Sequence, residues 1–287
     1  MFVRKILCIC FYLFVTMAVF SGTRFEYEWV GFSAPQSVCS YGRYLFISNM
    51  GSGDQNSNDG YVSKLTSKGE IVDKYWVSGL KAPRGMSVLN NRLYVADSGF
   101  IRGFNLLTRK EEFTLEMPET DMLTDIEPLR DGVSFAVSDA KNGLIYRVYF
   151  NGDYYSLILE PIEGVSGLFF KSGNLYFCAA ATENGKPISR VGYLKIRISK
   201  NEVIPYFVGS AVGRFRGIAV EDKSIFVTDY GTDEIPGRVF CFDTDENMMY
   251  PIWDRDLNLP GDFLMDGDDI WVPTAGDGKI KYISDIH

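Results

Sequence analysis

The sequence predicts an all-β fold: a six-bladed β-propeller in which each blade has four antiparallel strands. An apolar strand, a turn and a second apolar strand recur six times, with first apolar anchors 40 to 50 residues apart. Each unit continues with further stretches of alternating polar and apolar residues, joined by turns such as Asn-Gly. After residue 21, no stretch has the period of an amphipathic helix. Six units of about 45 residues are typical of a propeller.

The six strand pairs share a layout that assigns an inner strand to each blade. They occupy 34–49, 82–97, 123–139, 164–180, 214–229 and 259–274. Three of the pairs end in aspartate, at Asp97, Asp139 and Asp229. An aspartate at the end of a strand often accepts hydrogen bonds from nearby backbone N–H groups. We therefore expect these carboxylates to hold turns rather than to form a site.

The two ends of the chain are expected to complete the last blade together. After the sixth strand pair, the sequence offers a third strand at 279–286 and no fourth. Residues 24–30, RFEYEWV, alternate in the same way and precede the first blade. A ring that is closed by this N-terminal strand has no free seam. Closure of this kind predicts six blades rather than five or seven.

Residues 1–21 have the features of a secretory signal peptide. Arg4 and Lys5 precede an apolar run at 6–20, and small residues follow it. This run is shorter than the roughly 18 residues that indicate a membrane-spanning helix. Small residues permit cleavage after Ala18 or after Ser21. We therefore expect a secreted or periplasmic propeller at 22–287, associated with a membrane only if the signal segment is retained as an anchor.

The composition excludes several kinds of function. The chain has 287 residues, a formal charge of −8 and a single histidine, His287. Without an internal histidine it can form neither a Ser-His-Asp triad nor an HExxH zinc site. The acidic balance argues against nucleic acid as a partner.

The cysteines do not suggest a disulfide framework. Beyond the predicted signal peptide the chain has Cys39, Cys178 and Cys241, an odd number in widely spaced apolar stretches. No histidine is available to activate a thiolate, so we expect buried thiols that pack as small hydrophobic side chains. We also expect the protein to be a monomer.

Two of the strand pairs resemble those of a known superfamily. PRGMSVLNNRLYVADSG at 83–99 and FRGIAVEDKSIFVTDYG at 215–231 resemble the regucalcin/gluconolactonase-like propellers and the NHL-repeat propellers. The shared pattern is Pro-x-Gly-apolar, a short turn, and Leu-Tyr-Val-x-Asp. The resemblance implies a six-bladed propeller. For the lactonases, it also implies a divalent ion in the channel, held by Glu, Asn and Asp just before the first strand of several blades.

The positions that correspond to the lactonase metal ligands are found by counting back from the second strand of each pair, with a two-residue insertion allowed in blade three. We call these six positions the register. It contains no carboxylate, and two of its residues are arginine, whose charge opposes a divalent cation. We therefore expect no metal at these positions. Asp125 and Asp262 come one position later, so the loops would have to shift for them to rebuild a metal site. The six positions are Gln36, Arg84, Thr124, Ser166, Arg216 and Gly261.

An oxygen-rich loop at 54–60, DQNSNDG, has the look of a calcium-binding loop. Its glycine comes one residue late for an EF-hand, and Leu65 stands where the bidentate glutamate should be. We expect a solvated loop and predict no cofactor, with Ca²⁺ at this loop as the alternative.

Arg84 and Arg216 are the sharpest candidates for a binding site. They belong to blades two and five, which face each other in a six-bladed ring, so both are expected near the axis at one mouth of the channel. Two guanidinium groups in this position can clamp a carboxylate or a phosphate. The alternative is that neighbouring carboxylates or carbonyl groups neutralise them and close the channel.

These observations predict a non-enzymatic binding or scaffold domain that recognises a small anionic ligand or a protein partner at the channel mouth. The alternative is a gluconolactonase-like, metal-dependent lactone hydrolase with a rearranged metal site, since the fold alone does not establish activity. The residues predicted to line the mouth are Gln36, Arg84, Thr124, Asp125, Ser166, Arg216 and Asp262.

Overall fold

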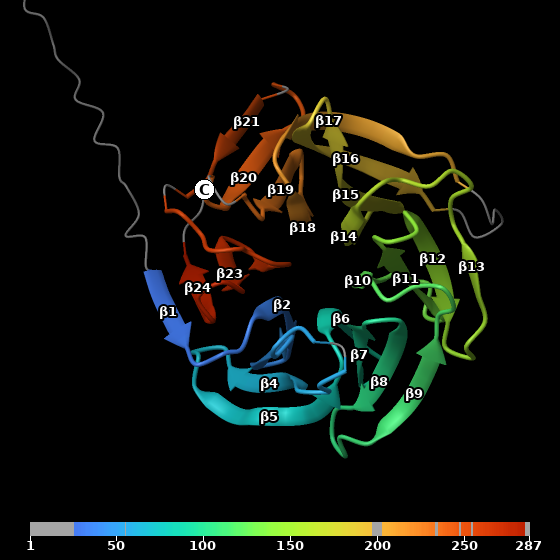
Figure 1. Cartoon of the computed structure of the whole chain (residues 1–287), viewed down its shortest axis with the longest axis vertical. Coiled ribbons are helices and arrows are strands. Elements are labelled where there is room, and N and C mark those ends of the chain that lie inside the picture. Colours follow the sequence, from blue (N-terminus) through green and yellow to red (C-terminus); the bar gives the residue numbers. More distant parts are fainter. Residues whose placement is uncertain are drawn as a thin grey trace, which may run out of the picture.

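A computed structural model confirms the propeller, with six four-stranded antiparallel sheets arranged as blades around a central axis (Figure 1). The structure describes residues 26–54, 56–196, 203–232, 235–246, 248–253 and 255–284. Within these ranges there is no helix, and so none that could cross a membrane. The predicted signal peptide at 1–21 lies outside the described residues.

The first three blades follow one another along the chain. Blade one contains β2 (Pro35–Tyr41), β3 (Tyr44–Asn49), β4 (Gly60–Thr66) and β5 (Ile71–Leu80). Blade two contains β6 (Pro83–Leu89), β7 (Arg92–Asp97), β8 (Phe100–Asn105) and β9 (Glu111–Glu116). Blade three contains β10 (Leu123–Pro128), β11 (Ser134–Asp139), β12 (Leu144–Tyr149) and β13 (Tyr154–Ser156).

The last three blades complete the ring. Blade four contains β14 (Val165–Lys171), β15 (Asn174–Glu183), β16 (Lys186–Lys195) and β17 (Tyr206–Val212). Blade five contains β18 (Phe215–Glu221), β19 (Ser224–Asp229), β20 (Arg238–Asp243) and β21 (Met248–Pro251). Blade six contains β22 (Leu264–Asp266), β23 (Asp269–Thr274), β24 (Lys279–Ile283) and the N-terminal β1 (Glu26–Val30).

The N-terminal strand closes the ring, as the sequence predicts. Strand β1 pairs with β24 from Glu26 opposite Ile283 to Val30 opposite Lys279. In Figure 1 the blue β1 therefore lies beside the red β24. Trp29 also contacts the first blade, because its indole lies against Gly69, where a Cβ atom would overlap it. The strand thus joins blade six to blade one.

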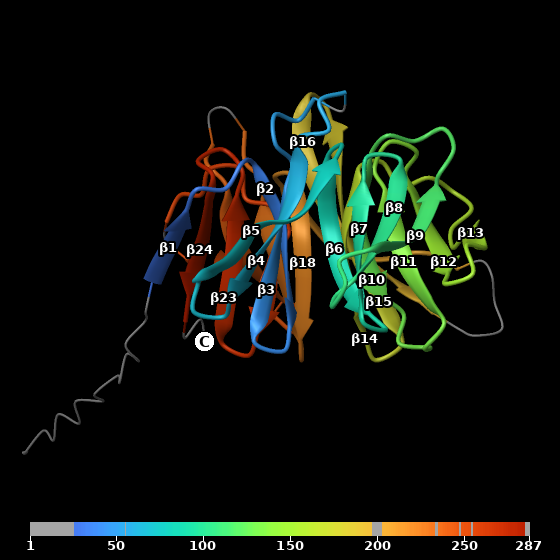
Figure 2. The ribbon, with the colours of Figure 1, turned by 90° about the horizontal axis from the view of Figure 1, so that it is seen from below.

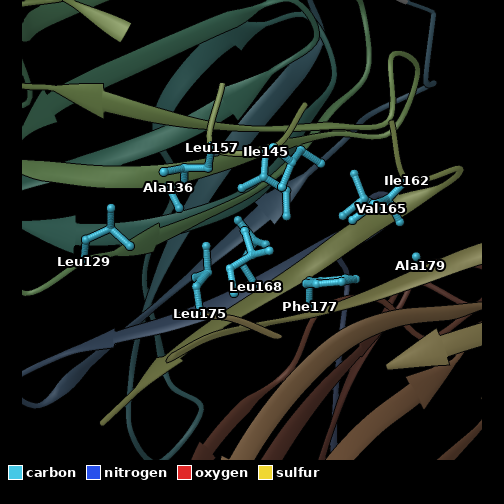
Figure 3. Packing of buried hydrophobic residues seen from close by; sticks show 12 residues of the cluster. Leu129, Ala136, Ile145, Leu157, Ile162, Val165, Leu168, Leu175, Phe177 and Ala179 are labelled. Carbon is cyan, nitrogen blue, oxygen red and sulfur yellow. The ribbon is translucent and has the colours of Figure 1, made fainter. Parts of the chain in front are cut away.

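Apolar side chains fill the spaces between neighbouring blades. Between blades three and four, Leu129 and Ala136 belong to the same cluster as Leu175 and Phe177 (Figure 3). Since each blade is covered by a neighbour on both faces, its central strands are buried almost throughout rather than on alternate residues. Aromatic side chains take part in this packing, as Tyr94 and Phe135 do between blades two and three. Cys39, Cys178 and Cys241 are free thiols, and the last two are fully buried.

In blades one, two, three and five, the polar residue at the end of the second strand braces the loop that leads into the inner strand. Asp97 Oδ1 accepts hydrogen bonds from the N–H groups of Lys81 and Ala82, both at 2.8 Å. Asp229 Oδ1 accepts one from the N–H of Arg214 at 2.7 Å. Asp139 accepts the hydroxyl of Thr120 in the preceding loop at 2.8 Å, and three further bonds from Lys141 and Asn142 in the turn that follows it. These carboxylates hold backbone, as expected from their positions at strand ends.

The inner strands run between the two faces of the ring, as the side view shows (Figure 2). The braced loops start them at equivalent points, so residues at the same repeat position meet at one mouth of the channel. Residues at the same repeat position in the sequence therefore lie at the same level along the channel axis.

Candidate functional site: the channel mouth

All six positions of the predicted register line a single small cavity at the channel mouth. Its volume is about 30 Å³. Tyr230, Gly85 and Asp262 complete its lining. Arg84 comes from β6 and Arg216 from β18, in blades two and five. The register positions in the lining are Gln36, Arg84, Thr124, Ser166, Arg216 and Gly261.

Arg84 brings an unsatisfied cation to this cavity. Its Nη1 atom is buried and has no hydrogen-bond partner among the described residues. Burial and the nearby positive charge of Arg216 hold the pKa of the Arg84 guanidinium below its ordinary value. In the part of the chain that the structure describes, neither arginine forms an ion pair. Buried guanidinium nitrogens are normally paired, so this atom calls for an explanation.

Arg216 is held by an aromatic ring that the sequence reasoning missed. Its guanidinium carbon lies 4.8 Å from the ring centroid of Tyr230, a cation–π contact. The N–H of Tyr230 donates to the carbonyl of Arg214 at 2.8 Å, which fixes the residue at the mouth. The only sequence signal was an aromatic residue directly after the strand-terminal Asp229.

The neutral residues of the register use their polar atoms in the wall. Gln36 Nε2 donates to the carbonyl of Ala34 at 3.1 Å. The Thr124 hydroxyl lies 2.9 Å from that of Ser138, and Ser166 Oγ donates to the carbonyl of Phe215 at 3.1 Å. These side chains shape the cavity, whereas the two arginines supply its charge.

The structure places Asp125 and Asp262 in the channel, one layer below the arginines. Both line a second chamber of about 290 Å³, which is lined by residues of the inner strands, among them Glu127. Asp262 lines the arginine mouth as well, whereas Asp125 does not. Asp125 Oδ2 accepts the N–H of Leu168 at 2.7 Å, and Asp262 Oδ2 accepts the hydroxyl of Ser37 at 2.9 Å. Each carboxyl therefore joins its blade to the next.

Two glycines make this layer possible. A Cβ atom on Gly85 would overlap the Cα of Asp125, and one on Gly217 would lie 2.9 Å from the Cα of Asp262. Asp125 of blade three thus packs against Gly85, which follows Arg84 in blade two. Asp262 of blade six packs in the same way against Gly217, which follows Arg216 in blade five. The channel therefore has approximate two-fold symmetry, with arginines and aspartates in opposite blades.

Burial favours the protonated forms of the carboxyl groups in the channel. Burial raises the pKa of Asp125 to about 7 and that of Glu127 to about 8. Burial, together with the charge of Asp125, raises the pKa of Asp262 well above its ordinary value. The mouth is thus cationic, while the chamber below it carries less negative charge than its composition suggests.

The donor set does not fit a divalent cation. Two guanidinium groups occupy the mouth, and both oxygens of Asp125 already accept backbone N–H groups, from Ile126 and Leu168. Among the described residues, no group of three or more His, Cys, Asp or Glu side chains is placed to hold a metal ion. In the loop at 54–60, Asp59 accepts hydrogen bonds from Ser52 and Ser57.

Comparison with known proteins supports the fold alone. No family model and no curated protein matches the chain. A virginiamycin B lyase from Staphylococcus aureus superposes with a TM-score of 0.60 at 15% identity, over 91% of this chain and 99% of the lyase. A gluconolactonase from Xanthomonas campestris gives 0.67 at 13% identity, over 89% and 87% of the two chains. A chain from a nidogen/laminin complex gives 0.61 at 13% identity, over 76% and 83%.

These neighbours confirm the predicted resemblance to gluconolactonase-like propellers at the level of architecture. The fold they share carries a lyase, a lactonase and a member of a protein complex. At this identity the fold does not choose among such functions. The function of this chain has to be argued from the residues at its own channel mouth.

Proposed function

We propose that this protein is a binding protein that captures a small anionic group at the channel mouth, between Arg84 and Arg216. The observation that carries the proposal is the buried Nη1 atom of Arg84, which has no partner among the described residues. An anion in the cavity would satisfy this atom and offset the repulsion between the two guanidinium groups. Charge-assisted hydrogen bonds to guanidinium are among the stronger contacts that proteins make.

The surroundings of the cavity favour capture of an anion over internal neutralisation. The charges of Asp121 and Asp97 also act on Arg84, but burial and the charge of Arg216 outweigh them, since the pKa of Arg84 is lowered. Asp262 lines the same cavity, but its pKa is raised and it accepts the Ser37 hydroxyl. Protonation of Asp262, which its raised pKa favours, would leave the charge of the guanidinium groups unbalanced. In a chain of formal charge −8, two cations in a narrow mouth form a local positive site that low-dielectric walls strengthen.

The proposal is tested by titrating sodium acetate into the full chain in a calorimeter, in a buffer whose own anion is bulky. Arg84→Gln should weaken acetate binding by about tenfold or more, the equivalent of about 1.5–3 kcal/mol for a lost charged hydrogen bond. Arg84→Lys should lose less affinity than Arg84→Gln, because lysine keeps the positive charge, although it lacks the paired N–H groups of guanidinium. Unchanged binding by Arg84→Gln would overturn the proposal.

Arg214 provides a matched control. It lies on the same segment, two residues before Arg216, but its side chain is exposed and does not line the cavity. Arg214→Gln removes the same charge and should leave acetate binding unchanged. An equal loss in Arg214→Gln and Arg84→Gln would mean that the anion responds only to general charge.

We also propose that the protein acts outside the cytoplasm, as a secreted or periplasmic protein. The support is the charged, apolar and small-residue order of 1–21. Mass spectrometry of the exported chain should find a new N-terminus after Ala18 or Ser21. Recovery of the protein with residues 1–21 intact in the cytoplasmic fraction would contradict this.

A further inference from the structure

A groove beside the channel mouth extends the arginine site. It has a volume of about 310 Å³ and lies between blades five and six. Tyr230 lines both the groove and the mouth, and Leu259 lines the groove two residues before Gly261 reaches the mouth. Pro236 and Leu257 add further apolar surface. The two cavities therefore meet at the residue whose ring holds Arg216.

Leu259 is held in an unusual conformation within this groove. Its φ is +54°, and it is the one branched aliphatic residue with positive φ in the part of the chain that the structure describes. Asparagine and glycine adopt this region at lower cost than leucine. The backbone is fixed there because its carbonyl accepts the N–H of Ala275 at 3.0 Å. Ala34, at the equivalent position of blade one, also has a positive φ of 47°, so this conformation belongs to the repeat. At Leu259 it keeps a half-buried apolar side chain in the groove.

The two cavities differ in size, so each suits a different part of one ligand: a charged head in the mouth and an apolar body in the groove. A water molecule needs roughly 10–15 Å³ of such space, so the mouth at about 30 Å³ has room for about two oxygen atoms. A carboxylate has two oxygens, whereas phosphate and sulfate have four. The groove is about ten times larger. Tyr230, Pro236, Leu257 and Leu259 give it apolar surface for an organic group, beside the polar Thr232, Asp256 and Asn258.

We propose that the site takes an organic monocarboxylate, with its carboxylate between Arg84 and Arg216 and its apolar body in the groove along Tyr230 and Leu259. This inference rests on the anion-binding function proposed above and specifies the class of ligand. Burial of each methylene group in the groove should raise affinity by up to about fourfold. The charge anchors the head, and the length of the body decides affinity.

The test compares acetate, hexanoate and the uncharged hexanamide by calorimetric titration into the full chain. Hexanoate should bind at least tenfold more tightly than acetate, and hexanamide should show no measurable binding. Leu259→Asn should abolish the advantage of hexanoate and leave the affinity for acetate unchanged. Leu259→Gly is a second variant that also accepts positive φ. Melting temperatures at or above the wild-type value would show that both variants fold.

Each outcome separates this inference from the function on which it rests. Equal affinity for acetate and hexanoate would overturn the monocarboxylate inference and leave the anion site standing. An advantage of hexanoate that persists in both Leu259 variants would also overturn it, because the body would then bind elsewhere. If hexanamide binds as tightly as hexanoate, the carboxylate does not contribute to binding, and the inference is overturned. If wild-type protein binds neither carboxylate, the proposed function fails as well.

Discussion

Arg216 lies close enough to Arg84 for its charge to help lower the pKa of the Arg84 guanidinium, although their strands belong to opposite blades. Burial contributes the larger part of this effect. Two like charges held together without an ion pair among the described residues are costly for a folded protein. An anion from outside would remove that cost, and the predictions below test this account and the fold that creates the site.

The closure of the ring should contribute strongly to stability. Deletion of residues 1–30 removes the five-residue strand β1 and its pairing with β24, and leaves Gly69 without the Trp29 indole. We expect the free energy of unfolding to fall by several kcal/mol, the scale of a lost packed strand. Urea denaturation measures it, and deletion of 1–25 alone is the control. Equal stability of the two truncated chains would contradict the role of β1.

Gly85 should tolerate no side chain. In Gly85→Ala the new Cβ would overlap the backbone of Asp125, so blades two and three must separate. We expect a loss of about 1–3 kcal/mol in the free energy of unfolding, typical of overpacking. Gly42→Asn is the control, because that turn is open and asparagine accepts its positive φ of 59°. A wild-type melting temperature for Gly85→Ala would be inconsistent with the layered channel.

The carboxylates at the strand ends should stabilise the fold mainly as hydrogen-bond acceptors for backbone N–H groups, rather than through their negative charge. Asp97→Ala leaves the buried N–H groups of Lys81 and Ala82 without their partner, so we expect a loss of about 2–4 kcal/mol on thermal unfolding. Asp97→Asn should lose less, because an amide oxygen can accept the same bonds and only the ion pair with Arg102, at 3.4 Å, is given up. Blade one already uses this arrangement, with Asn49 Oδ1 accepting the N–H of Ser33 at 3.2 Å. Equal losses for Asn and Ala would argue that the charge matters.

Stability should decrease between about pH 4.5 and pH 8 because of Glu127. Its pKa is raised from 4.5 to about 8 by burial, so the folded protein holds a proton that the unfolded chain releases. The stabilising contribution is therefore complete below pH 4.5 and is lost as pH rises through 8. Glu127→Gln keeps an oxygen for the N–H of Phe170 and should make this dependence less steep, with a gain on the order of 1 kcal/mol at pH 8. Part of the dependence should remain, because the pKa values of Asp125 and Asp262 are also raised. Urea denaturation at pH 5 and pH 8 measures both effects; identical slopes for the two proteins would contradict the raised pKa.

Periodicity accounts for what the sequence predicts well. The repeat gives the number of blades, the closing strand and the layer that contains Arg84 and Arg216, because equivalent positions in a ring must meet at one mouth. Roles that depend on the side chain at a repeated position are harder to predict. Tyr230 and Leu259 occupy backbone positions that other blades share, since Ala34 has the positive φ of Leu259, but their ring and apolar side chain are particular to blades five and six. The approach of Asp125 to Gly85 depends on the packing of two blades, which no single repeat encodes.

The most direct test of the account is the unfolding free energy of Arg84→Met, measured with and without acetate. Ligand that binds only the folded state raises this free energy by RT ln(1 + [L]/Kd). If Arg84 serves an external anion, the variant should be at least as stable as the wild type without acetate, because methionine removes an unpaired buried charge. Acetate should then stabilise the wild type and have no effect on the variant. A variant that loses about 3 kcal/mol or more, yet is still stabilised by acetate to the same extent, would show that Arg84 is neutralised within the protein.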